Sequence, residues 1–191
     1  MTRLILVRHG ESAWNAEGRV QGQSDPPLSK FGRRQADAIA EELADRGIRE
    51  IHSSDLRRAA QTANALAERT NLRVRLDRRL REIHQGLWEG RLRTEIKRKW
   101  PELVSEWEKD PWQCSPPEGE TLQQVAARAR SFLGDLLERS IDGSVAVITH
   151  KVPAALLTLQ VSRADPSSIW RLELNTGSWR ELEATADALP G

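Results

Sequence analysis

Two short, wholly apolar runs constrain the fold of this chain more than any other feature. They are Leu4-Ile5-Leu6-Val7 and Val145-Ala146-Val147-Ile148, both rich in branched side chains. Such runs are typical of strands buried on both faces, as in parallel sheets. His9 follows closely after the first run, and His150 follows closely after the second. Both histidines therefore lie at the strand ends where open α/β sheets bind their ligands.

Helical patterns lie between the two runs. Ser29 is expected to cap a helix whose apolar residues recur at helical spacing over 36–44. A short strand is expected over 50–53, and Ser54 or Asp55 is expected to cap the helix that follows it. This alternation of strands and helices favours an α/β fold.

The second half of the chain continues the pattern. Thr121 and Gln124 form a capping box that opens a helix reaching Leu137, and Pro153 suits the first turn of another helix. Partial alternation over 169–182 predicts two final strands. We therefore expect a three-layer α/β/α sandwich with a mostly parallel central sheet, forming a single domain over 1–191. The segment from about 86 to 120 has weaker periodicity and is interpreted as an inserted helical cap.

Composition excludes several classes of partner. Lys and Arg number 29 against 28 Asp and Glu, so no global charge favours nucleic acid or a membrane surface. Cys114 is the only cysteine, which excludes an intrachain disulfide and disfavours a thiolate zinc site. The N-terminal apolar run is too short for a signal peptide or a membrane span, so a cytoplasmic protein is expected.

Four ordered segments carry the chemistry. They read Arg8-His9-Gly10-Glu11-Ser12-Ala13-Trp14-Asn15, Ser53-Ser54-Asp55-Leu56-Arg57-Arg58-Ala59-Ala60-Gln61-Thr62-Ala63, Leu80-Arg81-Glu82-Ile83-His84-Gln85-Gly86-Leu87-Trp88-Glu89-Gly90 and Val147-Ile148-Thr149-His150. In this order and strand–helix context, the chain resembles the histidine phosphatase superfamily, also called phosphoglycerate mutase-like. The resemblance implies a phosphatase that hydrolyses small phosphate monoesters without a metal or another cofactor.

The resemblance assigns His9 as the nucleophile that forms a phosphohistidine. It places Arg8, Arg57 and His150 around the phosphoryl group, and it implies that Glu82 protonates the leaving group. The chemistry agrees, because a covalent intermediate splits a difficult hydrolysis into two easier steps. Arginine also binds two phosphate oxygens through its planar fork, while its charge keeps a neighbouring histidine neutral.

Other residues of the four segments are assigned smaller roles. The amide of Asn15 is expected to bind the phosphoryl group. Gln21, in the loop after the first segment, is expected to contact phosphate or substrate, and Ser12 is a weaker candidate for the same role. Arg58 is expected on the surface.

Lys151 departs from the family pattern, which usually has glycine after the second histidine. Lys151 either points outward or reaches into the pocket to bind a substrate carboxylate or a second phosphate. Some metal-independent phosphoserine phosphatases of the superfamily read His-Thr-Val-Pro where this chain reads His150-Lys151-Val152-Pro153. Phosphoserine is therefore a candidate substrate, beside α-ribazole phosphate and sugar phosphates.

Two alternatives to hydrolysis stay open. Phosphoglycerate mutase activity is disfavoured by the short chain and cap, because a mutase must exclude water from the phosphohistidine. A non-catalytic phosphate-binding regulator is disfavoured by the presence of both His9 and Glu82. The seven tryptophans suit core and cap packing, although an interface between two copies, hence a homodimer, stays open.

Overall fold

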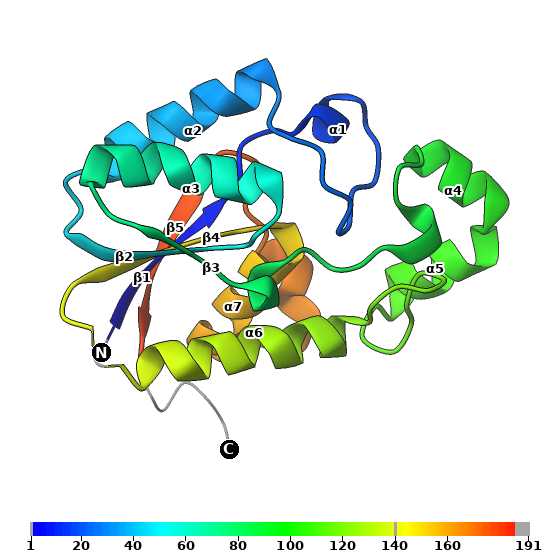
Figure 1. Ribbon diagram of the computed structural model, residues 1–191. Coiled ribbons are helices and arrows are strands. Elements are labelled where there is room, and N and C mark those ends of the chain that lie inside the picture. The colour runs from blue at the N-terminus through cyan, green and yellow to red at the C-terminus, as the bar shows by residue number, and fades with distance from the viewer. Residues whose placement is uncertain (1, 140, 186–191) are drawn as a thin grey trace.

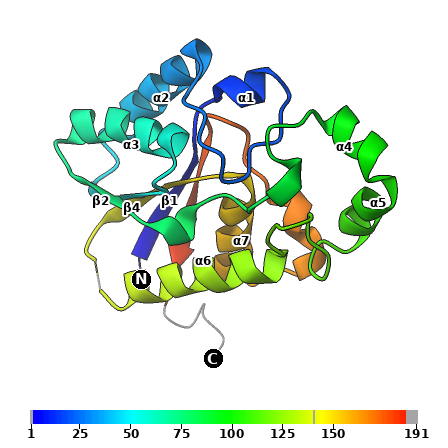
Figure 2. The same ribbon diagram turned by 45° about the vertical axis from the view of Figure 1, so that its right-hand side comes forward.

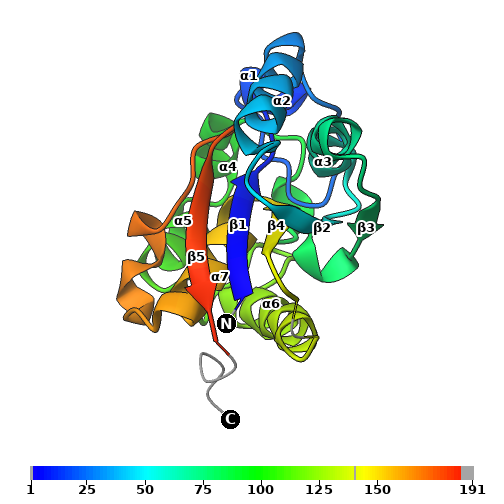
Figure 3. The same cartoon turned by 90° about the vertical axis from the view of Figure 1, so that its left-hand side faces the viewer.

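The computed structural model describes residues 2–139 and 141–185. These residues form a five-stranded sheet in the order β3-β2-β4-β1-β5, which Figure 3 shows across its full width. The strands are β1 (Thr2–Arg8), β2 (Ile48–Ser53), β3 (Val74–Leu76), β4 (Ser144–Thr149) and β5 (Trp179–Ala184). Only β5 runs antiparallel to its neighbour, so the sheet is mixed and mostly parallel, as expected.

Helices cover both faces of this sheet (Figure 1). The α-helices are α1 (Ala13–Ala16), α2 (Lys30–Leu43), α3 (Arg57–Thr70), α4 (Arg93–Lys99), α5 (Pro101–Lys109), α6 (Leu122–Leu137) and α7 (Lys151–Ser162). Three 3₁₀ helices span Arg78–Leu80, Gly86–Trp88 and Pro166–Arg171. No helix within the described ranges is long and apolar enough to cross a membrane.

The two central strands explain the unbroken apolar runs. Leu4 and Leu6 of β1 pack with residues of α6 and α7, whereas Ile5 and Val7 pack with residues of α2 and α3. Because successive side chains of a strand point to opposite faces, a strand covered on both sides needs apolar residues throughout. The three-layer α/β/α architecture is thus confirmed.

The start of α3 differs from the prediction. Its N-cap is Leu56, and neither Ser54 nor Asp55 caps it. The Arg57 backbone N–H donates instead to Asp25 Oδ1 at 2.6 Å. Both predicted caps have other partners, since Asp55 pairs with Arg81 and Ser54 contacts His150.

The C-terminal prediction of two strands over 169–182 is wrong in part, because β5 is the only strand within residues 169–185. The other predicted strand is replaced by the 3₁₀ helix Pro166–Arg171, which the side chain of Asp165 caps. Ile169 of this helix is buried against Val152 and Leu156. Contact with the side of α7 therefore decides the conformation of this segment, over its weak alternation.

Helices α4 and α5 come from the segment interpreted as a cap. Figures 1 and 2 show both helices set off from the sheet and its helical layers. They have a small core of their own, in which Ile96 and Val104 are buried against Trp88. Their inner sides line the cavity that His9 also lines.

Candidate active site

His9 lies at the carboxyl end of β1 and is almost completely buried, with 2% of its surface exposed. Its backbone N–H donates to the carbonyl of Thr149 at the end of β4, at 3.1 Å. The ring atom Nδ1 lies 2.7 Å from the Gly10 carbonyl oxygen. A carbonyl can only accept, so Nδ1 carries the proton and Nε2 keeps its lone pair. This tautomer is the one that a nucleophilic Nε2 requires.

The surroundings of His9 keep its ring neutral. Burial lowers the pKa of His9 well below its ordinary value, and the charges of Arg58 and Arg8 lower it further. The hydrogen bond with Gly10 acts in the opposite direction. Burial dominates because an imidazolium loses its hydration inside the protein.

The predicted roles of two adjacent arginines are exchanged. Arg58, which was expected on the surface, is 1% exposed and lines the cavity beside His9. Arg57, which was expected to bind phosphate, is exposed and is absent from the cavity lining. The prediction that Arg57 points into the pocket is therefore wrong.

Helix geometry explains the exchange. The buried face of α3 contains Arg58, Ala59, Thr62, Ala63 and Leu66. Positions 58, 62 and 66 follow the four-residue spacing of one helix face, and this face packs against the body of the protein. Position 57 lies about 100° away, since each residue of an α-helix advances by that angle.

Arg8 and Arg58 form a cationic pair without carboxylate partners. Within the described part of the chain, neither guanidinium makes a salt bridge. Arg58 donates to the carbonyls of Gly22 and Ser24, both at 2.8 Å, and Arg8 donates to the carbonyl of Leu174 at 2.6 Å. The Nε atom of each arginine is buried without a partner among these residues.

Burial lowers the pKa of Arg58 to about 10, and it also lowers the pKa of Arg8. Both groups therefore stay charged at neutral pH. A buried cation is costly unless an anion compensates it. The two guanidiniums thus make a site for an anion next to the His9 ring.

Two side-chain amides also line the cavity, those of Asn15 and Gln21. The oxygen of Asn15 accepts from the Ser12 backbone N–H at 3.1 Å, and the oxygen of Gln21 accepts from the Ser12 hydroxyl at 2.6 Å. With both oxygens engaged, each amide presents its NH₂ group for another acceptor.

Ser12 itself is fully buried and is not part of the cavity lining. It is the N-cap of α1 and accepts from the Asn15 backbone N–H. The prediction that Ser12 contacts substrate is therefore wrong. The Ser12 hydroxyl instead accepts from the Asn15 backbone N–H and donates to the Gln21 side chain, so it caps α1 and orients Gln21.

His150 is completely buried, and its ring centroid lies 4.9 Å from that of His9. It does not line the cavity, although the prediction placed it on the phosphoryl group. Ser54 Oγ lies 2.8 Å from Nε2 and itself accepts from the Leu56 N–H. The Ser54 hydroxyl can donate to Nε2, and in that tautomer the proton of the neutral His150 ring is on Nδ1. Nδ1 has no partner among residues 2–139 and 141–185.

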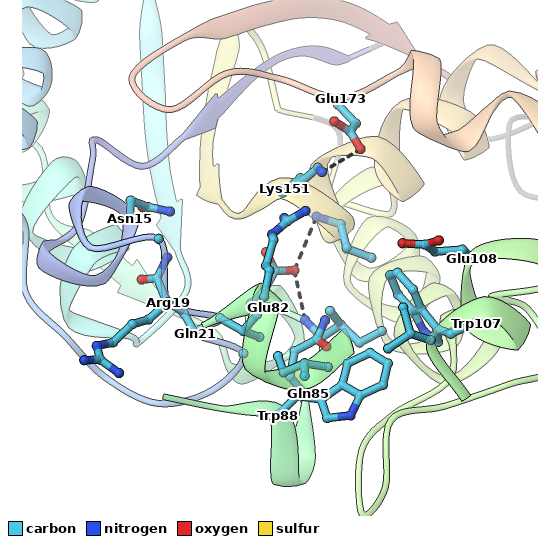
Figure 4. Close-up of a pocket in the computed structure, with 18 of the residues that line it drawn as sticks. Asn15, Arg19, Gln21, Glu82, Gln85, Trp88, Trp107, Glu108, Lys151 and Glu173 are labelled. Carbon is cyan, nitrogen blue, oxygen red and sulfur yellow. Dashed lines mark hydrogen bonds and ion pairs between the residues drawn. The ribbon is translucent and has the colours of Figure 1, made fainter. Parts of the chain in front are cut away.

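Glu82 reaches the cavity from the loop after the 3₁₀ helix Arg78–Leu80. Its Oε1 accepts from the backbone N–H groups of Ile83 at 2.9 Å and Val152 at 3.3 Å (Figure 4). Val152 belongs to the first turn of α7, so a helix N-terminus holds this carboxyl. Backbone N–H donors at a helix N-terminus favour an anionic group, so these two contacts fix the position of Glu82 Oε1 in the cavity.

Lys151 reaches into the cavity, as one of its two predicted alternatives proposed. Its Nζ lies 2.8 Å from Glu173 Oε1, and Figure 4 shows these two groups turned toward each other. The same Nζ lies 5.7 Å from the ring centroid of Trp170. The histidines His52 and His84 do not line the cavity.

The cavity has a volume of about 550 Å³, far larger than a phosphoryl group alone requires. Its far wall comes from α4, α5 and the two 3₁₀ helices nearby, through the side chains of Trp88, Arg93, Ile96, Lys97, Val104, Trp107, Glu108 and Trp170. Within the residues that the structure describes, no three His, Cys, Asp or Glu side chains gather in a way that could hold a metal ion.

The sequence pattern of the histidine phosphatase superfamily (branch 1) matches residues 4–189. The chain belongs to this superfamily. Phosphoserine phosphatase 1 of Hydrogenobacter thermophilus is 37% identical over 179 residues, which cover 94% of this chain and 85% of that protein. Glucosyl-3-phosphoglycerate phosphatase of Mycobacterium tuberculosis is 41% identical over 174 residues, covering 84% of this chain and 77% of that protein.

Solved structures of this superfamily match the whole fold. A mycobacterial glucosyl-3-phosphoglycerate phosphatase in complex with VO3 superposes with a TM-score of 0.90 at 36% identity, over 98% of this chain and 94% of that one. The same phosphatase with inorganic phosphate superposes with a TM-score of 0.86 at 35% identity, over 96% and 90% of the two chains. The phosphoglycerate mutase-like fold and the family resemblance are thereby confirmed.

Two residues of the site have no role in the sequence-based predictions. Glu89 accepts four hydrogen bonds from Gln23, Ser24 and Gln85, and so joins the loop that holds Arg58 to the loop that carries Glu82. Glu173 is the partner of Lys151. The place of Glu89 within the third motif is a signal that could have marked it, whereas the irregular tail around Glu173 holds no such signal.

Proposed function

We propose that this chain is a metal-independent phosphatase that hydrolyses small phosphate monoesters through a phosphohistidine on His9. One observation carries the proposal: a neutral, buried His9 lies beside two buried guanidiniums, Arg8 and Arg58, that have no carboxylate partner in the described chain. Relatives named as phosphatases, one of them solved with inorganic phosphate, support it.

In the first step, His9 Nε2 attacks phosphorus while the bond from phosphorus to the ester oxygen breaks. The leaving alkoxide takes the proton of the Glu82 carboxyl group and departs as an alcohol. Positive charge that develops on the ring is stabilised by the Nδ1–H donating to the Gly10 carbonyl. The phosphoryl oxygens are held by Arg8, Arg58 and the NH₂ groups of Asn15 and Gln21, which are already oriented before substrate binds.

His150 adds one more donor to the phosphorylated form. Its Nδ1–H lies unpaired beside the His9 ring, so it is available to an oxygen of the phosphoryl group on Nε2. In the second step, the Glu82 carboxylate takes a proton from a water molecule that attacks phosphorus. The N–P bond breaks, inorganic phosphate leaves, and His9 and Glu82 return to their starting forms.

No metal ion is needed in this scheme, because fixed cations and N–H donors neutralise the charge on the transferring group. Metal-dependent phosphoryl transfer uses Mg²⁺ for the same electrostatic purpose. Here Arg8 and Arg58 supply two full charges within a buried site, where electrostatic interactions are stronger than in water.

The test is release of inorganic phosphate from a panel of monoesters, including p-nitrophenyl phosphate, in excess EDTA. We expect the wild type to turn over and to trap an acid-labile phosphoryl group after a rapid quench. His9→Ala is expected to abolish both. Turnover that needs an added divalent cation, or that survives in His9→Ala, would contradict the proposal.

A further inference from the structure

Glu173 is an unexpected group in a cavity that receives a phosphate dianion. It lines the same cavity as His9, and it is close enough to Arg8 for its charge to raise the pKa of that guanidinium. The phosphatase mechanism proposed above has no use for it. A second carboxylate repels a substrate that carries only negative charge, so its presence favours a substrate that also carries a positive group.

Lys151 supplies the opposite charge at the same place. Its Nζ and Glu173 Oε1 are 2.8 Å apart, and each side chain keeps 30% of its surface exposed. Lys151 is also the first residue of α7, where the helix macrodipole disfavours a cation. The positive charges of Arg8 and Arg58, which line the same cavity, repel the Lys151 ammonium as well. A lysine kept at such a position suits the binding of an anionic group beyond the phosphate.

Together these two side chains present one positive and one negative charge to the leaving group of a monoester. We propose that Lys151 and Glu173 form a subsite for an α-amino-acid group, so that the substrate is a phosphate ester of the L-phosphoserine type. The substrate carboxylate contacts Lys151, and the substrate ammonium contacts Glu173. This inference rests on the phosphatase function proposed above.

Four alternating charges explain why the subsite selects both groups at once. When a zwitterionic group binds, the substrate carboxylate contacts Lys151 and the substrate ammonium contacts Glu173. Each of the two protein charges then has two neighbours of opposite sign instead of one. A leaving group with a carboxylate alone meets the repulsion of Glu173, and one with an ammonium alone meets that of Lys151. The ring of Trp170 lies beside the Lys151 ammonium and limits where it can move.

A second ion pair at the cavity provides a contrast. Lys97 of α4 and Glu108 of α5 lie 3.3 Å apart, but 63% and 56% of their side-chain surfaces are exposed. Water screens such a pair strongly, so it contributes little to recognition. Lys97→Gln is therefore a matched control for Lys151→Gln.

The experiment compares kcat/KM for four short monoesters. L-phosphoserine carries both charges, O-phosphoethanolamine only the ammonium, 3-phosphoglycerate only the carboxylate, and glycerol 3-phosphate neither. We expect wild type to have its highest kcat/KM for L-phosphoserine, with about a two- to fivefold loss for each missing group, as for partly exposed ion pairs. Glu173→Gln is expected to lower kcat/KM for the two esters that carry an ammonium, relative to kcat/KM for 3-phosphoglycerate. Lys151→Gln is expected to lower kcat/KM for the two esters that carry a carboxylate, relative to kcat/KM for O-phosphoethanolamine.

Three results would overturn the subsite. They are equal wild-type values across the four esters, a best substrate that lacks the ammonium, or variants that change all four values by the same factor. Lys97→Gln is expected to leave the ratios among the four within about twofold. Turnover of p-nitrophenyl phosphate with a flat panel refutes the subsite alone, whereas no turnover of any ester refutes the phosphatase function and the subsite with it.

Discussion

At the scale of single residues, the site depends on charges placed where water cannot reach them. Arg58 is 1% exposed and donates to backbone carbonyls, and it makes no salt bridge within the described residues, although the carboxylates of Glu82, Asp25 and Glu89 act on it from farther away. Fixed donors of this kind stabilise charge that develops during reaction, because they need no reorganisation. The adjacent Arg57 has the same guanidinium group, but it is exposed and does not line the cavity.

This difference between neighbours predicts a large difference in activity. Arg58→Gln is expected to lower kcat/KM by about 10²–10³, the usual effect of removing one such donor. Arg57→Gln is expected to change kcat/KM by less than about threefold, since an exposed side chain outside the cavity contacts no substrate. Steady-state phosphate release measures both variants.

Arg58 is buried, so its variant needs a check on folding. Circular dichroism melts of Arg58→Gln, and activity of Arg58→Lys, separate loss of the guanidinium from loss of the fold. Lysine keeps the charge but cannot bind two oxygens in one plane, so only partial recovery is expected. Equal losses in Arg57→Gln and Arg58→Gln would contradict the assignment of Arg58.

At the scale of secondary-structure elements, loops between them bring the catalytic groups together. Glu89, just after the 3₁₀ helix Gly86–Trp88, accepts from the backbone of Gln23 and Gln85 and from both donors of Ser24. Gly22 has φ +53, and a Cβ there would lie 2.0 Å from the Glu89 carboxylate. The loop 22–24 can therefore approach Glu89 only because glycine stands at its start.

These hydrogen bonds of Glu89 predict that its substitution lowers both the stability of the protein and its affinity for phosphate. Glu89→Gln turns an acceptor oxygen into an NH₂ group that faces N–H donors. It is expected to lower the free energy of unfolding by about 1.5–3 kcal/mol. Because loop 22–24 holds Arg58, the affinity for inorganic phosphate is expected to fall as well.

Urea denaturation and isothermal titration with phosphate measure the two effects. Glu41→Gln, at an exposed position of α2, is the matched control and is expected to change neither value appreciably. A destabilised Glu89→Gln that keeps full phosphate affinity would show that Glu89 has a structural role only.

At the scale of the whole molecule, the cavity lies where the sheet and the α4–α5 segment meet. The strand ends and α7 supply the charged groups, whereas α4 and α5 supply the far wall. Ligands that fill the charged end stabilise the folded protein, because the unfolded chain has no such site. Inorganic phosphate and vanadate are the simplest ligands of this kind.

This linkage predicts thermal protection by anions. At a concentration one hundred times its Kd, phosphate is expected to add about 2.7 kcal/mol of stability, or about 5–10 °C in Tm. Melts in EDTA with chloride at matched ionic strength provide the reference. Arg58→Gln is expected to lose most of the shift, and a wild type that phosphate and vanadate fail to protect would contradict an anion site.

Much of the fold and part of the site follow from local sequence. The strands at 4–7 and 145–148, the cap at Ser29 and the capping box at Thr121 are present as predicted. These features could be predicted because burial on both faces and satisfaction of helix-end N–H groups are local requirements. His9 could be predicted for a similar reason, since it follows directly after a buried strand.

The rest of the site depends on packing between distant segments. Only the face that α3 turns to the body distinguishes Arg58 from Arg57, and only the internal partners of Ser12 remove it from the cavity. The partner of Lys151 comes from the irregular tail, and a 3₁₀ helix replaces a strand there because Ile169 packs against α7. The sequence by itself determined which strands form and which motif follows them. The tertiary structure alone decided which neighbouring side chain enters the cavity, because burial and charge pairing are properties of contacts between residues far apart in the chain.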